Sequence, residues 1–349
     1  GMRTGVGLAD GGEVASEDAP LVARIVAAGG RIIGKAKMTE LGMDGLGSLM
    51  HYPMPRNPRA PGYSPGGSST GTAVAVASGL ARWGVGGDGL GSIRIPAAFC
   101  GLVGLKPTRT RLERKGIHSP VRSLDAVGPI TRTVEDCALL WQVMAGEQVQ
   151  AITPWTPDRV GVPVIGLRAS RSVAAAFQRV LAALAIEIER VALPLDRATF
   201  LGGMTGAYEL STGALGPRTT TRAGRTSLAL GGAFSPADVS RLEAQRAALR
   251  DATDRVLART PILAMPTTAI PPPALSAALM ACKTDVLLLR SVGAYTPLAN
   301  LCDLPAIAVP CGEDERGRPL SIMFVAGRGE ETRLLQIALA VQRPALGRT

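Results

Sequence analysis

Aromatic side chains are scarce in this sequence, because phenylalanine, tryptophan and tyrosine make up only 3% of its 349 residues. Proteins that bind single-stranded nucleic acid usually stack its bases on aromatic rings. The net charge of +10 comes mainly from arginines that are dispersed along the chain rather than clustered. We therefore expect a solvated basic surface and no nucleic-acid partner.

Histidine is also rare, because only His51 and His118 are present. A serine hydroxyl is a weak nucleophile at neutral pH and needs a base, which is most often a histidine. Neither histidine stands beside a catalytic-looking motif, so we expect both to be loop or surface residues. The scarcity argues against chemistry of the Ser-His-Asp type.

Long apolar runs and paired cysteines are missing as well. No run of about 18 uncharged apolar residues is present, so we expect no membrane-spanning helix and no membrane partner. The first residues, GMRTGVGLADGG, lack the basic and apolar regions of a signal peptide. The five cysteines are scattered without a C-x-x-C pair, which predicts reduced, buried thiols in a cytoplasmic protein and no metal site.

Glycine and serine, in contrast, are concentrated in two loops. The first runs from Gly66 to Gly71 and contains Ser68; the second runs from Gly86 to Ser92. Glycine is favoured where the backbone takes a positive φ or approaches another group closely. Successive N–H groups in such a loop can converge on one anion. The pattern therefore predicts a nest for an anion beside a nucleophilic serine, although two ordinary loops flanking a helix remain an alternative.

The segment that contains both loops resembles the amidase signature family. The matching runs are Gly66-Gly67-Ser68-Ser69, then residues 91–101 (GSIRIPAAFCG), then residues 104–108 (GLKPT). The resemblance covers nearly the whole chain and is weakest in the middle third. It implies an α/β fold in which helices cover both faces of a mixed central sheet, in agreement with the alternation of expected strands and helices.

The resemblance also implies roles for the residues of the two loops. Ser92 would be the nucleophile that attacks an amide or ester carbonyl, and Ser68, on a cis peptide bond, would be the bridging serine. The backbone N–H groups of Gly89, Leu90, Gly91 and Ser92 itself would form the oxyanion hole.

Other residues of the same loops would have supporting roles. Ser69 would hold the first loop, and Asp88 and Arg94 would join the two loops as a structural pair. Leu90 departs from the family pattern, which usually has glycine there. A leucine resists a positive φ, so a distorted oxyanion hole is expected if the nest requires that conformation.

The lysine of the family's mechanism has no counterpart in this chain. In the family it belongs to a Pro-x-x-x-Lys-Asp segment, which would precede Met2. We interpret Lys35, which follows an expected strand, as structural. We therefore expect this polypeptide, as an N-terminally short member, to have little or no amidase activity.

These observations predict an amidohydrolase that cleaves a carbon–nitrogen bond of a small-molecule amide through a serine acyl-enzyme, without a cofactor or metal. Two alternatives remain open. The first is a non-catalytic homologue that binds an amide or a carboxylate. The second is a subunit of the glutamyl-tRNA amidotransferase type that acts with a tRNA-dependent partner. That two copies of this chain form a homodimer is a further hypothesis.

Residues 1–349 are expected to form a single amidase-like domain. It would comprise a half with the catalytic loops (1–146), a variable substrate-side region (147–260) and the C-terminal part of the core sheet (261–349). Strands are expected over 31–34, 83–86, 160–166, 186–193, 261–267, 306–312 and 321–325. Helices are expected over 16–29, 73–80, 134–144, 172–184, 236–260, 294–303 and 330–342, with Thr133 as an N-cap.

Overall fold

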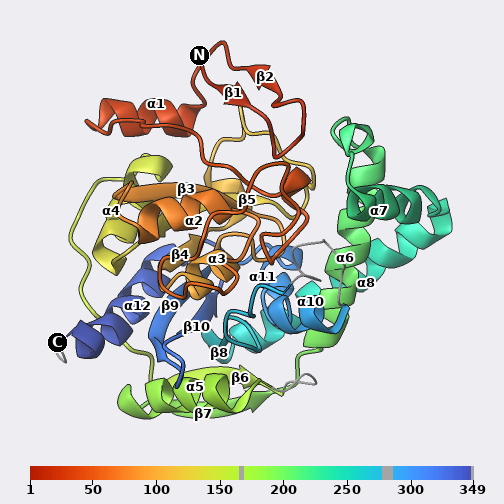
Figure 1. Cartoon of the computed structure of the whole chain (residues 1–349). Helices are drawn as coiled ribbons and strands as arrows, with labels where there is room; N and C mark the ends of the chain where they lie inside the picture. The colour runs from red at the N-terminus through yellow and green to blue at the C-terminus, as the bar shows by residue number, and fades with distance from the viewer. Residues whose placement is uncertain (165–168, 277–285, 347–349) are drawn as a thin grey trace.

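The computed structural model describes residues 1–164, 169–276 and 286–346. Its centre is an eight-stranded sheet with the strand order β3-β5-β4-β9-β10-β8-β6-β7 (Figure 1). The strands of this sheet are β3 (Trp83–Asp88), β4 (Val103–Lys106), β5 (Ala126–Thr131), β6 (Arg159–Pro163), β7 (Glu187–Val191), β8 (Ile262–Pro266), β9 (Ala306–Glu313) and β10 (Pro319–Ala326). β6 is parallel to β7 and β8, whereas the other neighbouring strands pair antiparallel. The mixed α/β sheet expected from the sequence is confirmed.

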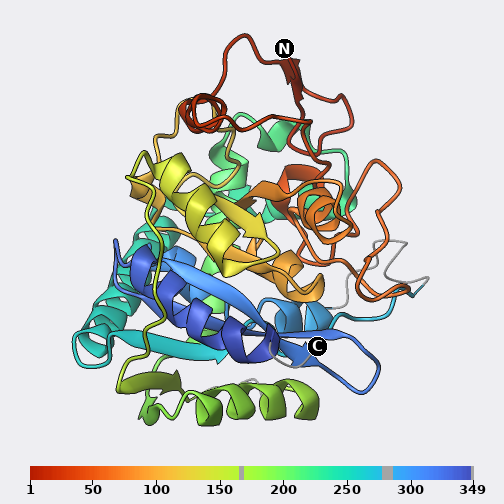
Figure 2. The same ribbon diagram turned by 90° about the vertical axis from the view of Figure 1, so that its left-hand side faces the viewer.

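Helices cover both faces of this sheet. The helices are α1 (Pro20–Ala27), α2 (Thr70–Ala77), α3 (Arg94–Phe99), α4 (Val134–Ala145), α5 (Arg171–Ala183), α6 (Leu195–Thr212), α7 (Arg222–Gly232), α8 (Pro236–Leu257), α10 (Val286–Val292), α11 (Pro297–Leu301) and α12 (Glu331–Leu346), with short 3₁₀ turns η1 (Glu40–Gly42), η2 (Arg109–Arg111) and η3 (Gly216–Arg218). Figure 2 shows α4 and α12 lying side by side over the sheet, with α5 along its lower edge. Trp141 and Phe324 belong to the apolar cluster under these helices. Ile93 and Ala97 belong to a separate cluster beneath α2 and α3.

Two of the local predictions are confirmed at the level of single residues. Thr133 caps α4, because its side chain accepts a hydrogen bond from the N–H of Asp136. The apolar run after the second glycine loop is buried, as α3 followed by β4. α3 and β4 therefore support the second loop from below.

Other local predictions are wrong. Residues 31–34 form no strand: Ile33 is 61% exposed, and no strand of the described ranges pairs with this segment. Helices also form where none was expected: residues 205–233 include α7 and the end of α6, and α6 packs against α11 and α8. On α8 the helical spacing predicts a buried apolar stripe, but only Leu249 and Val256 of it are buried, whereas Val239, Leu242 and Leu257 are half-buried.

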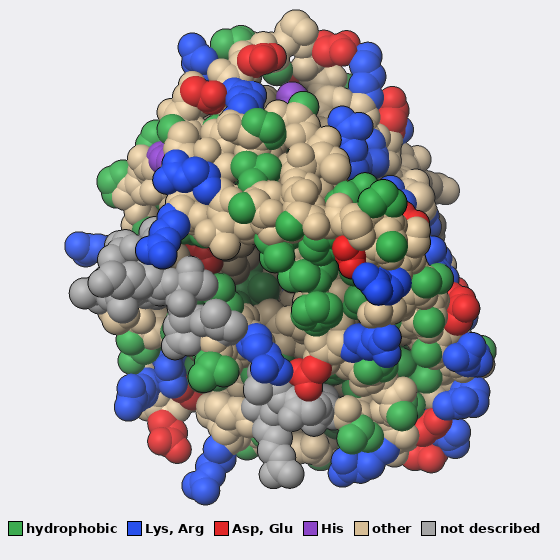
Figure 3. All heavy atoms as spheres, turned by 90° about the vertical axis from the view of Figure 1, so that its right-hand side faces the viewer, with side chains coloured by type: hydrophobic (Ala, Val, Ile, Leu, Met, Phe, Trp, Pro, Cys, Tyr) green, Lys and Arg blue, Asp and Glu red, His purple; other side chains and the backbone are tan. Residues whose placement is uncertain are grey.

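A separate hairpin of β1 (Arg3–Thr4) and β2 (Glu13–Val14) lies near the N-terminus. None of the helices in the described part of the chain is both long and apolar enough to cross a bilayer. Figure 3 shows the face that lies on the right in Figure 1. This face is hollowed near its middle; hydrophobic side chains gather beside the hollow and basic ones are spread around it. The basic charge on this face is dispersed rather than gathered in one patch.

Candidate functional site

The two glycine-rich loops lie side by side at the end of β3. The N–H of Ser69 in the first loop donates to the carbonyl oxygen of Ser92 in the second, at 3.2 Å. The hydroxyl of Ser69 donates to the carbonyl oxygen of Gly87 on β3, also at 3.2 Å. Ser69 therefore ties the first loop both to β3 and to Ser92.

Ser68 follows a cis peptide bond between Gly67 and Ser68. The loop before it is tightly enclosed: a Cβ atom on Gly67 would lie 2.2 Å from the carbonyl oxygen of Asp44. Gly66 has a φ of +76°, which favours glycine. The glycines of this loop are thus required by a close approach and by a positive φ.

The Ser68 side chain is buried, with 3% of its surface exposed, whereas Ser92 is partly exposed. The Oγ atom of Ser68 lies 3.4 Å from the position of a Cβ atom on Gly42 in η1. The carbonyl oxygen of Ser68 accepts a hydrogen bond from the N–H of Thr39 at 3.2 Å. Neither serine hydroxyl donates a hydrogen bond to any group in the described ranges, so both oxygens are free for a substrate or a base.

A fully buried ion pair underlies the second loop. Asp88 and Arg94 are both 0% exposed; Arg94 Nη2 lies 2.9 Å from Asp88 Oδ1, and Arg94 Nε lies 3.0 Å from Oδ2. The same carboxylate accepts the N–H groups of Gly91 at 2.7 Å and of Ile93 at 3.1 Å. Asp88 therefore fixes the turn that presents Ser92. Among the described residues, neither Asp88 nor Arg94 hydrogen-bonds to the first loop, so the expectation that this pair joins the two loops is wrong.

Groups from α11 and the residue before it complete this network. Arg94 donates to the carbonyl oxygen of Thr296 at 2.9 Å and to Asn300 Oδ1 at 2.6 Å. Asn300 Nδ2 donates to the carbonyl oxygen of Asp88 at 2.7 Å. Burial opposes ionisation of Asp88, but the charge of Arg94 and the hydrogen bonds from Arg94 and Asn300 outweigh it and lower the pKa of Asp88 to about 2. Asp88 is thus ionised at neutral pH.

The N–H groups of the second loop are not equivalent. Because the Gly91 N–H donates to Asp88, Gly91 does not offer its donor to an oxyanion as the sequence analysis expected. The N–H groups of Gly89, Leu90 and Ser92 have no backbone or side-chain acceptor in the described part of the chain. Three of the four expected donors therefore remain for the nest.

Leu90 does not distort the loop, contrary to the expectation from its departure from the family pattern. Its φ is not positive; within this loop the positive φ, +127°, is at Gly91. The Leu90 side chain instead packs toward α6, where a Cβ atom on Gly202 would lie 2.7 Å from Leu90 Cδ2. The carbonyl oxygen of Leu90 accepts a hydrogen bond from the hydroxyl of Thr296 at 2.6 Å. The absence of a side chain at Gly202 thus provides the room that Leu90 needs.

No lysine in the described part of the chain hydrogen-bonds to Ser68 or Ser92. Lys35 is exposed and donates to the carbonyl oxygen of Met2 at 3.2 Å, and Lys37 lies 3.9 Å from the centre of the Tyr52 ring. Lys106 is fully buried and donates to the carbonyl oxygen of Pro107 at 2.7 Å. Burial and the charge of Arg94 lower the pKa of Lys106 to about 8. Lys115, the remaining described lysine, forms an ion pair with Glu17.

The two histidines lie outside this site. His118 is exposed in the loop before β5, and His51 is exposed with its Nε2 atom 2.9 Å from Glu40 Oε1. Glu40 is 0% exposed, and its carboxylate accepts the N–H groups of Thr220 at 2.9 Å and Thr221 at 3.2 Å. It therefore connects η1, which lies against Ser68, to the loop before α7. This role of Glu40 could not be predicted from the sequence, because no local pattern pairs position 40 with position 220.

Arg94→Met is expected to lower the free energy of unfolding by about 3–5 kcal/mol, because it leaves the Asp88 carboxylate buried without its counter-charge. Chemical denaturation of the two proteins measures the difference. Arg82→Met is the matched control: the Arg82 side chain is 65% exposed and pairs with Asp136 at 2.9 Å. Loss of that surface pair is expected to cost less than about 1 kcal/mol. Equal effects of the two substitutions would contradict this account of the buried pair.

Comparisons with known proteins show which proteins and structures this chain is similar to. The family model described as Amidase matches residues 1–163 and 207–335. A glutamyl-tRNA(Gln) amidotransferase subunit from Koribacter versatilis is 30% identical over 94% of this chain and 78% of its own length. A fatty acid amide hydrolase from Medicago truncatula is 31% identical over 94% of this chain, which spans only 59% of that protein. The crystal structure of a glutamyl-tRNA(Gln) amidotransferase subunit from Thermotoga maritima superimposes with a TM-score of 0.84 at 26% identity, covering 98% of this chain and 80% of its own.

Proposed function

Because the chain belongs to the amidase family of amide hydrolases, we propose that it cleaves a carbon–nitrogen amide bond through an acyl-enzyme on Ser92. The observation that supports this most directly is the unused N–H groups of Gly89, Leu90 and Ser92 around a partly exposed serine hydroxyl. Donors held in this way stabilise the negative charge that develops on a carbonyl oxygen under attack.

In the proposed reaction, Ser92 Oγ attacks the carbonyl carbon and gives its proton to Ser68, which passes its own hydroxyl proton to the leaving nitrogen. The carbonyl oxygen becomes an oxyanion that the nest holds. The carbon–nitrogen bond then breaks, the amine leaves with a proton, and water hydrolyses the ester on Ser92. Asp88 and Arg94 touch no substrate in this scheme and position the loop, and Ser69 holds the bridging loop against β3. None of the four described lysines hydrogen-bonds to Ser68, so we expect slow turnover.

The proposed substrate is a small-molecule amide. The similarity to a protein named as a fatty acid amide hydrolase supports a substrate of this kind. The similarity to amidotransferase subunits supports a second candidate, in which the released ammonia passes to a tRNA-dependent partner. We also propose a cytoplasmic location, because the four cysteines in the described ranges are free thiols.

Ammonia release from a panel of small aliphatic and aryl amides and from glutamine tests the function. We expect slow release from at least one amide, and covalent modification of Ser92 by a fluorophosphonate, located by peptide mapping. A chain that releases no ammonia and is not modified at Ser92 would contradict the proposal and would favour a non-catalytic binding protein. Release from glutamine alone, together with copurification of partner subunits, would favour the amidotransferase role.

A further inference from the structure

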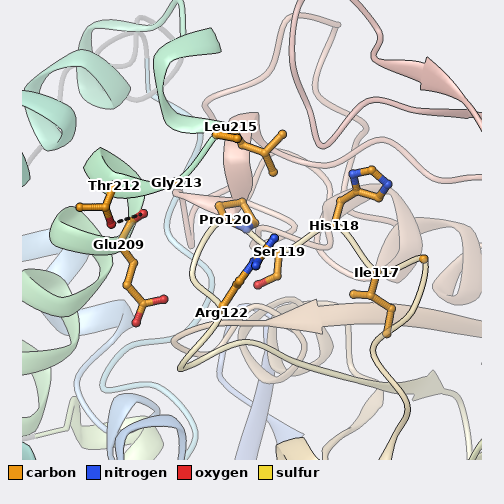
Figure 4. A pocket seen from close by; sticks show the side chains of 11 residues that line it. Ile117, His118, Ser119, Pro120, Arg122, Glu209, Thr212, Gly213 and Leu215 are labelled. Carbon is orange, nitrogen blue, oxygen red and sulfur yellow. Dashed lines mark hydrogen bonds between the residues drawn. The ribbon is translucent and has the colours of Figure 1, made fainter.

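Two adjoining cavities lie beside residues 116–122, the loop that leads into β5. Their volumes are about 530 Å³ and about 420 Å³, and both are lined by Ile117, Ser119 and Arg122. Figure 4 shows the larger one between this loop and the end of α6, with the Arg122 side chain extending beside Ser119. None of the residues that line them belongs to the two serine loops. The cavities therefore lie outside the two serine loops.

Three arginines, Arg109, Arg114 and Arg122, line the smaller cavity. Nη1 of Arg114 donates to the carbonyl oxygen of Asp125 at 2.7 Å. Nε of Arg109 and Nη2 of Arg114 are buried but have no hydrogen-bond partner among the described residues. Buried donors in folded proteins almost always have an acceptor, so these two nitrogens indicate a site for a ligand with acceptor oxygens.

The acidic groups nearby leave this cluster positively charged. The Asp303 carboxylate accepts the backbone N–H of Arg109 at 2.8 Å. Burial raises the pKa of Asp125 to about 6, so part of its negative charge is lost in mildly acidic solution. Glu209, which lines the larger cavity, accepts the N–H of Ser123 at 3.0 Å. Near the smaller cavity, three guanidinium groups therefore outnumber the two carboxylates of Asp125 and Asp303.

The larger cavity adds an apolar surface to this charged end. Ile117, Pro120 and Leu215 line it, and Leu215 packs against the cluster that contains Leu41. In Figure 4, Leu215 and Ile117 lie on opposite sides of the space. The combined volume is in the range of pockets that bind small organic ligands. A lone inorganic ion would leave most of it unfilled.

We propose that these cavities bind a small organic oxyanion, a carboxylate or a phosphate ester. Its charged group lies among Arg109, Arg114 and Arg122, and its apolar part lies over Ile117 and Leu215. Guanidinium groups match the paired oxygens of both anions in a bidentate geometry. This inference does not depend on the reaction at Ser92, because binding is measured without turnover.

Calorimetric titration with benzoate and with phenyl phosphate tests the proposal, and the two arms distinguish the carboxylate from the phosphate ester. We expect saturable binding of at least one, weakened by added salt and at least tenfold by Arg122→Gln. The matched control is Arg255→Gln, an exposed position on α8, which should bind like the unmodified protein. Benzyl alcohol, which has no charge, should not bind.

Arg109→Gln is a second variant at the charged end, and thermal melting checks that each variant is folded. The Arg122 side chain is exposed, so Arg122→Gln should fold normally. Three outcomes would overturn the proposal: neither aromatic anion binds, folded Arg122→Gln and Arg109→Gln bind like the unmodified protein, or inorganic phosphate alone binds. Because none of these assays involves Ser92, their failure would leave the proposed amidase reaction unaffected.

Discussion

Ser92→Ala is expected to abolish covalent labelling by a fluorophosphonate and to lower amide turnover by at least about 10³-fold. The substitution removes the only oxygen of this side chain, while the N–H group of residue 92 and its neighbours in the nest stay in place. The substrate can still be held by the nest, but no acyl-enzyme can form on residue 92. Intact-mass measurement over time gives the labelling rate, and ammonia release gives the turnover.

Ser78→Ala is the matched control, because Ser78 is exposed at the end of α2 and lies outside both loops. It should be labelled and should turn over amides like the unmodified protein. Ser68→Ala separates the bridging role from the nucleophilic one, since Ser92 would then remain but lose its proton acceptor. Labelling that persists undiminished in Ser92→Ala would assign the nucleophile to another residue.

The sequence predicted the central part of this site because the information there is local. The glycines of the two loops, both serines and the Asp88–Arg94 pair lie within a short stretch, and Arg94 is only six positions after Asp88. The cis bond before Ser68 was implied by family resemblance and is present in the structure. The proposed roles of these residues in catalysis are still predictions.

The partners that complete the site could not be predicted, because they lie far away in the sequence. Arg94 and Asn300 are separated by 206 positions, and Glu40 and Thr220 by 180. A buried guanidinium or carboxylate must find acceptors or donors, but no pattern in the sequence says which loop supplies them.

The incorrect strand and the missed helices have a related cause. The isoleucines at positions 32 and 33 have a high strand propensity, but a strand needs a neighbour, and both side chains remain exposed. α6 contains Gly202, Gly203 and Gly206, which weaken the helical signal. Its packing against α11 and against Leu90 compensates for that weak propensity. In both segments, tertiary contacts rather than local propensity therefore determine the secondary structure.

Gly91→Ala is expected to lower the rate of labelling at Ser92 at least about 100-fold, comparable to the loss of an oxyanion donor. Gly91 has a φ of +127°, which an alanine rarely adopts. Its new Cβ atom would lie 2.5 Å from Thr296 Oγ1 and 2.8 Å from Ile95 Cδ1, so the turn would have to move. That movement would break the hydrogen bond to Asp88 and displace the N–H groups beside Ser92.

Gly89→Ala is the matched control in the same loop. A Cβ atom on Gly89 would meet nothing within 4 Å, and its φ is not positive. The backbone N–H is retained, so labelling should stay within about threefold of the unmodified protein. The free energy of unfolding, measured for both variants, distinguishes a local change of the nest from loss of the fold. If Gly91→Ala reacted as fast as Gly89→Ala, the N–H groups of this turn could not be what stabilises the oxyanion, because only the former substitution forces them to move.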